Sequence, residues 1–240
     1  MSIGRPPRRV FVYVDGFNLY HRRLENDPPS KWLCLRKLAS EFLFEHDNVE
    51  VIKFFTARVD PFADPTKPTP KQQRQATYWK ALESRGVEII KGELAPRQRR
   101  CKAGACGRFL TFETMSEKMS DVNLALHVYR DYIEKQPDVI CVISADIDVL
   151  PALKMIRERA GNGDFPRVLI YIFLPIQDND LLQSRKPEHC RIAITRQLSN
   201  LHVSKSRLPD IVQLPDGTSV QCPDVWLPVQ KQGLLSTGSP

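Results

Sequence analysis

Four aspartates are the residues of this 240-residue chain that are best placed to do chemistry. Three follow apolar runs that are typical of buried strands, and one opens an amphipathic stretch: Asp15, Asp146, Asp148 and Asp121. Carboxylates brought close together repel one another and resist ionisation, so a bound cation usually neutralises them. Carboxylate oxygens suit hard divalent ions such as Mg²⁺ or Mn²⁺. The pattern therefore predicts an acidic metal pocket of the kind used in phosphate chemistry.

The elements that must position these aspartates alternate along the chain. Short apolar runs rich in β-branched and aromatic residues predict strands at residues 9–14, 49–58, 87–92, 138–144 and 167–174. Helical patterns lie between them, at residues 35–44, 72–84, 120–135 and 149–160. This alternation predicts an α/β fold, a three-layer sandwich around a mostly parallel sheet of about five to six strands.

The predicted sheet brings the acidic residues to one edge. Ligands of open α/β sheets bind beyond the carboxyl ends of the strands, where the strand order reverses. With the order 3-2-1-4-5, the first and fourth strands are neighbours, so Asp15 and Asp146 face each other there. Asp121 then arrives from the first turn of the helix before the fourth strand, where the helix dipole favours a carboxylate.

The helix at 120–135 has clear boundaries in the sequence. Ser120 is a suitable N-cap, and Pro137 ends the helix. Four large apolar residues follow a helical period and predict one apolar face: Val122, Leu126, Tyr129 and Ile133.

Each polar residue of the pocket also has a purely structural alternative. Asp121 is a favourable helix-start acid, and Asp148 is a possible cap for a helix that starts near Val149. Asp15 beside Gly16 is compatible with turn chemistry, and Asn18 with bonding to the backbone of the same turn. The metal pocket explains all of them together, whereas the structural alternative needs a separate reason for each.

A second charged feature is basic. The chain carries a formal charge of +7, and residues 95–114 contain a run of cations without an acid until Glu113: Arg97, Arg99, Arg100, Lys102 and Arg108. We expect a basic loop insertion that follows a phosphate backbone, with a solvated loop as the alternative. Phe17 and Tyr20 are candidates for stacking on bases, with core packing as the alternative.

The cysteines give no strong site. Cys101 and Cys106 lie in the basic segment, but no second Cys/His pair follows at zinc-binding spacing, so structural zinc is disfavoured. No disulfide framework and no apolar run of 18 residues or more is present. We expect a cytoplasmic protein with no membrane contact. The sequence assigns no protein partner and no oligomeric state.

The remaining segments give weaker expectations. Residues 60–71 contain four prolines and predict an exposed loop. A helix is expected around 192–201 and a strand near 210–214. The domain is expected to span residues 9–215, with a partly disordered C-terminal extension at 216–240.

Three short motifs resemble those of the NYN domain, and most closely its LabA-like branch. They are VDGFNL at 14–19 after the first strand, EKMSDVN at 117–123 before a helix, and SADID at 144–148 after the fourth strand. NYN domains belong to the PIN-like nuclease superfamily, and the resemblance spans roughly residues 9–215. The chain departs from the family at Ala145, where glycine is usual, and at Ile147, where a small polar residue is usual.

The resemblance implies a PIN-like fold and metal-dependent cleavage of RNA. By position, the metal-binding carboxylates would be Asp15, Asp121 and Asp146, with Asp148 as a further catalytic acid. The substrate-binding set would include Asn18, Ser144 and Lys118 beside Arg97, Arg99 and Arg100 of the basic run.

Three functions compete. The first is a Mg²⁺- or Mn²⁺-dependent endoribonuclease that acts on single-stranded RNA. The second is an RNA-binding or regulatory protein with little turnover, which is disfavoured because all the carboxylates are retained. A phosphatase or phosphotransferase is disfavoured because Asp15 has no second aspartate two residues later and the chain has no P-loop. The absence of a GxGxxG motif after the first strand also disfavours dinucleotide binding.

Overall fold

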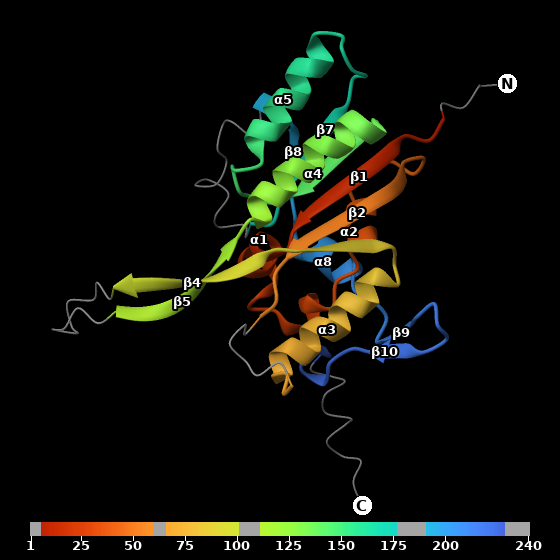
Figure 1. Cartoon of the computed structure of the whole chain (residues 1–240). Helices are drawn as coiled ribbons and strands as arrows, with labels where there is room; N and C mark the ends of the chain where they lie inside the picture. Colours follow the sequence, from red (N-terminus) through yellow and green to blue (C-terminus); the bar gives the residue numbers. More distant parts are fainter. Residues whose placement is uncertain (1–5, 60–65, 101–110, 177–190, 229–240) are drawn as a thin grey trace, which may run out of the picture.

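Six parallel strands form the centre of the molecule. The structure is a computed structural model that describes residues 6–59, 66–100, 111–176 and 191–228 (Figure 1). The strand order is β3-β2-β1-β6-β7-β8. The strands are β1 Arg9–Asp15, β2 Asn48–Thr56, β3 Val87–Lys91, β6 Val139–Ile143, β7 Leu169–Leu174 and β8 Ile194–Gln197. The five expected strands are therefore confirmed, they lie in the order 3-2-1-4-5 that was assumed for them, and one edge strand is added.

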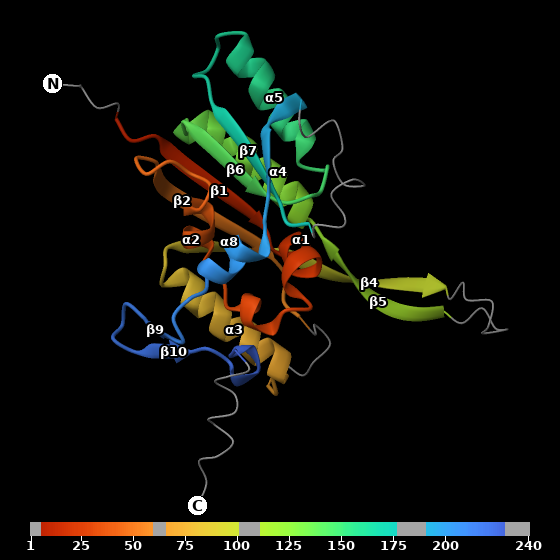
Figure 2. The same ribbon diagram turned by 180° about the vertical axis from the view of Figure 1, so that it is seen from behind.

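Helices cover both faces of this sheet and complete a three-layer α/β fold of the PIN-like kind. One face carries α4 Ser120–Lys135 and α5 Leu150–Gly161 (Figure 1). Figure 2 shows the other face, with α1 Gly16–Leu19, α2 Leu35–Ser40, α3 Pro70–Glu83 and α8 Asn200–Lys205. Single turns lie at η1 Tyr20–Leu24, η2 Pro28–Lys31 and η5 Asp224–Trp226.

The central strand β1 shows why the sheet forms. Val10, Val12 and Val14 point into the core beneath α2 and α3, whereas Phe11 and Tyr13 point into the core beneath α4 and α5. All five side chains are fully buried. A continuous apolar run without alternation is what a strand covered on both faces requires.

The segment expected as a basic loop is a β-ribbon instead. β4 Glu93–Arg100 and β5 Thr111–Lys118 pair antiparallel, with Arg97 opposite Thr114 and Arg100 opposite Thr111. Figures 1 and 2 show this ribbon projecting from the edge of the molecule near α1. The charged composition indicated an exposed segment, but the strand pairing comes from contacts between residues far apart in sequence.

The helix expected around 192–201 is wrong. Residues 191–192 are helical, but residues 194–197 are β8, which pairs with β7, and α8 begins at Asn200. Ser199 starts α8 with a capping box, because its hydroxyl accepts from the His202 N–H while Nδ1 of His202 accepts from the Ser199 N–H. Pairing with β7 therefore outweighs a weak local preference.

The described structure continues past residue 215, where the end of the domain was expected. The predicted strand near 210–214 is β9 Ile211–Gln213, which pairs with β10 Ser219–Gln221. Beyond β10, Cys222 and Leu227 are buried in the main core. Residues 216–228 of the extension expected at 216–240 are therefore part of the described fold, and residues 229–240 lie outside the described part of the chain.

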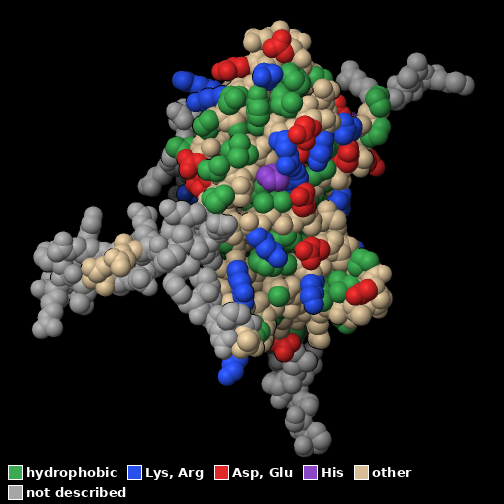
Figure 3. Space-filling model, viewed as in Figure 1, with side chains coloured by type: hydrophobic (Ala, Val, Ile, Leu, Met, Phe, Trp, Pro, Cys, Tyr) green, Lys and Arg blue, Asp and Glu red, His purple; other side chains and the backbone are tan. Residues whose placement is uncertain are grey.

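The expected apolar face of α4 is only partly buried. Val122 and Leu126 are 58% and 60% exposed, whereas Leu124, Val128 and Tyr132 form the buried stripe. Figure 3 shows hydrophobic side chains gathered at the surface over α4 and α5. Within the described residues, no helix has both the length and the apolar character to cross a membrane.

Candidate functional site

The site is built on a hydrogen bond between two neighbouring strands. Asp15 ends β1, and Ser144 follows β6, its neighbour in the sheet. The Ser144 hydroxyl donates to Oδ2 of Asp15 at 2.9 Å, and both side chains are buried. The carboxyl ends of β1 and β6 are therefore joined at the predicted switch point.

The short helix α1 is held against the same place. Oδ1 of Asp15 accepts the Asn18 backbone N–H at 2.9 Å and so caps α1, as the turn alternative anticipated. In turn, Oδ1 of Asn18 accepts the Ala145 N–H at 2.9 Å. Among the described residues, the Nδ2 group of Asn18 has no acceptor, so it is available for a ligand.

Gly16 lets α1 approach the sheet. A Cβ at this position would lie 2.6 Å from the Phe55 carbonyl oxygen and 2.7 Å from a ring carbon of Phe54. Both distances are shorter than real Cβ contacts, and the first atom belongs to the backbone of β2. Glycine is therefore required beside Asp15 by packing, not by an unusual backbone angle.

The loop after β6 orders itself around Asp146. The Asp146 N–H donates to the Ser144 hydroxyl oxygen at 3.0 Å, and the Asp148 N–H donates to Oδ1 of Asp146 at 3.1 Å. The Asp148 side chain is exposed and does not cap α5, whose N-cap is Val149 without a side-chain bond. The helix-cap alternative for Asp148 is therefore wrong.

Asp121 lies in the first turn of α4, as expected, but Ser120 does not cap the helix. The N-cap is Met119, whose φ of 77° lies in the left-handed region that side chains rarely adopt. Ser120 is the first helical residue and is buried. The sharp turn from β5 into α4 therefore sits two residues before Asp121, and strained backbone of this kind is common beside functional sites.

The carboxylates affect one another electrostatically. Burial raises the pKa of Asp15 to about 6, and the charges of Asp121 and Asp146 add to the rise, while the bonds from Asn18 and Ser144 oppose it. Burial likewise raises the pKa of Asp121, with the charges of Asp146 and Asp148 adding to it. The structure thus brings the four aspartates within electrostatic reach.

The carboxylate oxygens are the type of ligand that a divalent ion prefers, but the described side chains do not form a closed coordination shell. Among residues 6–59, 66–100, 111–176 and 191–228, no three His, Cys, Asp or Glu side chains are grouped tightly enough to hold a metal ion. The charges of Asp121 and Asp146 nevertheless add to the raised pKa of Asp15, the charge of Asp146 adds to that of Asp121, and a cation would relieve this repulsion. A hard ion that keeps several waters needs only one or two protein carboxylates directly.

The basic residues are placed by their backbone only. Arg97, Arg99 and Arg100 lie in β4, and Lys118 is the last residue of β5, two residues before α4 begins. Lys102, Arg108 and the Cys101/Cys106 pair lie outside the described residues. The ribbon therefore leads directly into the helix that carries Asp121.

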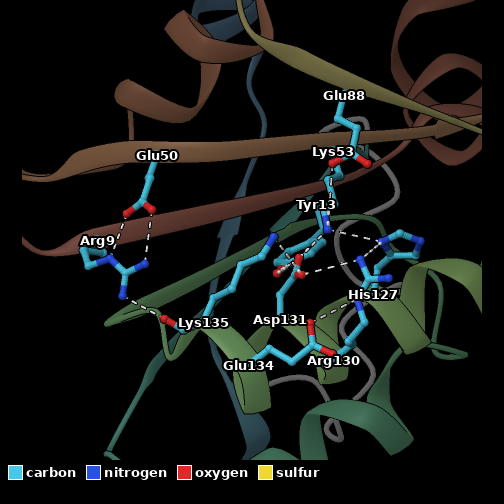
Figure 4. A network of polar contacts seen from close by, with 10 residues as sticks. All are labelled: Arg9, Tyr13, Glu50, Lys53, Glu88, His127, Arg130, Asp131, Glu134 and Lys135. Carbon is cyan, nitrogen blue, oxygen red and sulfur yellow. Dashed lines mark hydrogen bonds and ion pairs between the residues drawn. The ribbon is translucent and has the colours of Figure 1, made fainter.

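A buried ionic network, which the sequence analysis did not predict, anchors α4 to the sheet (Figure 4). Nζ of Lys53 on β2 lies 2.5 Å from Oδ2 of Asp131 on α4, and the Tyr13 hydroxyl donates to the same oxygen at 3.0 Å. Lys135 reaches the other oxygen at 3.2 Å. A lysine inside the apolar run of β2 was the signal available in the sequence.

The network also lowers the pKa values of Asp131 and His127. Burial alone would raise the pKa of Asp131, but the Lys53 ammonium and the Tyr13 hydroxyl hold it below its ordinary value. Nδ1 of His127 lies 3.2 Å from Nζ of Lys53, and burial and that charge lower the pKa of the imidazole. Because Tyr13 is two residues from Asp15, the network sets the position of α4 relative to the end of β1.

Comparison with known proteins agrees with this architecture. The NYN domain profile matches residues 9–166, and the chain belongs to the NYN domain family. This is a nuclease-like family of the PIN-like superfamily. The match covers β1, the ribbon, α4 and β6, and therefore all four aspartates.

Two individual proteins are also similar. The chain is 31% identical over 181 residues to 6-hydroxy-3-succinoylpyridine 3-monooxygenase HspA of Pseudomonas putida, covering 65% of this chain and 58% of that protein. The chain thus spans less than two thirds of that relative. A solved structure of a protein of unknown function from Vibrio parahaemolyticus aligns with a TM-score of 0.44 at 14% identity, over 82% of this chain and 96% of the other.

Proposed function

We propose that the chain is a Mg²⁺- or Mn²⁺-dependent endoribonuclease that hydrolyses phosphodiester bonds of single-stranded RNA. The observation that carries this proposal is the convergence of Asp15, Asp121 and Asp146 on the carboxyl edge of β1 and β6 within an NYN domain. Carboxylates at a switch point suit metal-assisted phosphate chemistry.

Asp15, Asp121 and Asp146 would hold the ion. When bound, such an ion activates water and neutralises charge on phosphate oxygens. The other roles belong to the chain itself: Ser144 orients the Asp15 carboxylate, and the Asp148 N–H orients Asp146. Asp148 supplies a further negative charge beside Asp121.

Substrate contacts would come from both sides of the acidic residues. The Nδ2 group of Asn18 can donate to a phosphate oxygen, because its carbonyl oxygen is already bonded to the Ala145 N–H. The basic ribbon residues Arg97, Arg99, Arg100 and Lys118 would follow the phosphate backbone beyond it. Ser144 is buried and bonded inside the site, which favours an orienting role over direct contact with phosphate.

The test is cleavage of labelled single-stranded RNA with and without Mg²⁺ or Mn²⁺. Asp15→Asn and Asp146→Asn should each abolish metal-dependent cleavage while the protein still unfolds cooperatively. Asp164→Asn is the matched control, because this exposed carboxylate follows α5 and is remote from the site. Wild-type cleavage by the Asp146→Asn protein would overturn the mechanism. RNA binding without cleavage by the wild-type protein would favour the regulatory alternative.

The similarity to a monooxygenase favours a second candidate, oxygenation of a hydroxypyridine. Such a reaction takes one oxygen atom from O₂ and two electrons from a reductant. The discriminating measurement is binding of 6-hydroxy-3-succinoylpyridine to the wild-type chain by calorimetry, beside the RNA assay. Micromolar binding of this compound without RNA cleavage would replace the ribonuclease proposal.

A further inference from the structure

A cavity of about 580 Å³ lies beside α1, and none of the four aspartates is among its lining residues. Its walls come from α1, η1, the end of β2 and α3, with Trp226 from the C-terminal turn. The volume is typical of pockets that take small ligands. The acidic site does not use this cavity. The chemistry of the residues that line the cavity therefore indicates which ligand it would bind.

Aromatic rings dominate the lining. Phe17, Tyr20, Trp79 and Trp226 all contribute surface, and Tyr20 is 37% exposed. Trp226 is fixed from behind, because it packs on Trp32 with ring centroids 6.3 Å apart. Half-buried, rigid rings around an open cavity offer flat apolar faces on which a planar ligand stacks.

The charged groups around the same cavity are mostly cations. Lys31, Arg58, Lys71 and Arg74 line it, whereas Glu25 is the one acid among the described residues of the lining, and its carboxylate lies 3.2 Å from Nδ1 of His21. Nζ of Lys31 lies over the Tyr20 ring, 5.3 Å from its centroid. A planar ligand that also bears negative charge therefore matches the lining.

The cavity and the acidic site share α1. Asp15 caps this helix, and the next residues, Gly16 and Phe17, line the cavity. The strands that lead to the two places are also adjacent. Thr56 at the end of β2 lines the cavity, Asp15 ends β1, and β2 pairs with β1. A nucleic-acid strand that crosses α1 would thus pass both places.

We propose that this cavity holds an unpaired nucleobase of single-stranded RNA whose backbone lies across the acidic site. Stacking on aromatic rings beside a cationic backbone path is the usual physical basis of single-strand binding. The inference rests on the proposed function for the identity of the polymer. It adds the subsite that selects unpaired over paired nucleotides, because a base inside a duplex cannot enter the cavity.

The test measures binding separately from cleavage. Fluorescence anisotropy of a labelled single-stranded oligoribonucleotide is recorded with the Asp146→Asn protein, which keeps the cavity. In this background Tyr20→Ala should weaken binding about tenfold, in line with the loss of one stacked base. Tyr20→Phe, which keeps the ring, should stay within about twofold. Phe44→Ala removes a more exposed ring outside the cavity and should change nothing.

A second variant, which removes a positive charge from the lining, tests the inference independently if the Tyr20→Ala protein does not fold. Arg58 is exposed and lines the cavity, so Arg58→Gln should weaken binding and lower the slope of affinity against salt by about one. Lys205→Gln on α8 is the matched control outside the lining. Equal affinity of the parent, Tyr20→Ala and Arg58→Gln proteins would overturn the inference.

The remaining outcomes are also decisive. Tyr20-dependent binding without cleavage by the wild-type protein supports the base cavity and overturns the ribonuclease. Cleavage that is insensitive to Tyr20→Ala and Arg58→Gln supports the ribonuclease and overturns the base cavity. Tyr20-dependent binding of nicotinate, a free heteroaromatic carboxylate, without oligoribonucleotide binding would assign the cavity to a small molecule and overturn the inference.

Discussion

The Ser144 hydroxyl lies 2.9 Å from Oδ2 of Asp15, so the ends of two adjacent parallel strands share one buried hydrogen bond. The same hydroxyl oxygen accepts the Asp146 N–H at 3.0 Å. One side chain therefore connects the carboxylate of Asp15 to the backbone of Asp146. Ser144 acts as a positioning residue for both.

Replacing Ser144 with alanine should shift the pH dependence of cleavage. The hydrogen bond from Ser144 favours ionised Asp15, so its loss raises the pKa of that carboxyl further above its ordinary value. The acidic limb of the profile of kcat/KM against pH should move to higher pH. Ser204→Ala, which removes an exposed hydroxyl on α8, is the control. An unshifted limb with uniformly reduced activity would assign Ser144 a packing role only.

Ionisation of Asp15 should lower the free energy of unfolding as the pH rises from 4 to 6. Its pKa is raised to about 6 in the folded state, so the folded protein binds the proton more tightly than the unfolded chain does. The resulting stabilisation is complete below the ordinary pKa and is lost as the pH rises to about 6. Raising the pKa of Asp15 to about 6 corresponds to at most about 3 kcal/mol in the free energy of unfolding.

The Asp15→Asn protein should therefore lose this pH dependence and unfold at higher denaturant concentration than wild type at pH 7 without divalent ions. Urea unfolding at several pH values measures both effects. Mg²⁺ should raise the midpoint of the wild-type protein and leave that of the variant unchanged, because binding to the folded state stabilises it. A wild-type midpoint that is constant between pH 4 and 6 would contradict the assignment.

Gly16→Ala should destabilise the fold and impair the site. The new Cβ would meet the Phe55 carbonyl oxygen at 2.6 Å, and neither α1 nor β2 can yield without moving Asp15. We expect a loss of about 1–3 kcal/mol in the free energy of unfolding and reduced cleavage. Gly161→Ala is the matched control, since nothing lies within 4 Å of a Cβ at the end of α5. There the change should be neutral or stabilising by up to about 1 kcal/mol.

Lys53→Met should be among the most damaging substitutions away from the acidic residues. Lys53 is 1% exposed and Asp131 is fully buried, so removal of the ammonium leaves a buried carboxylate without its nearest cation. Breaking a buried pair in this way costs about 3–5 kcal/mol. Chemical denaturation measures the loss.

The double variant Lys53→Met, Asp131→Asn should recover much of that loss, because the uncompensated charge is gone. It should also show whether the network matters for chemistry. Since α4 carries Asp121, a repacked helix would lower cleavage even where stability is restored. Strictly additive single and double losses would show that the two side chains do not act as a pair.

The sequence alone indicated the strands of the sheet and the aspartates that follow them. A buried parallel strand must be apolar on both faces, so runs such as 10–14 and 139–143 were visible locally, and the acids just beyond them were placed by topology. Asp15 and Asp121 lie where that pattern predicted, at a strand end and in the first turn of a helix.

Only the tertiary structure decided which competing role each side chain takes. Ser144 bonds to Asp15 across two strands 129 residues apart, and Lys53 bonds to Asp131 across a distance of 78 residues. The face of α4 that is buried, the pairing of β4 with β5 and the edge strand β8 were likewise set by partners far along the chain. Local patterns fix which elements form, whereas pairing and burial depend on contacts that no short window contains.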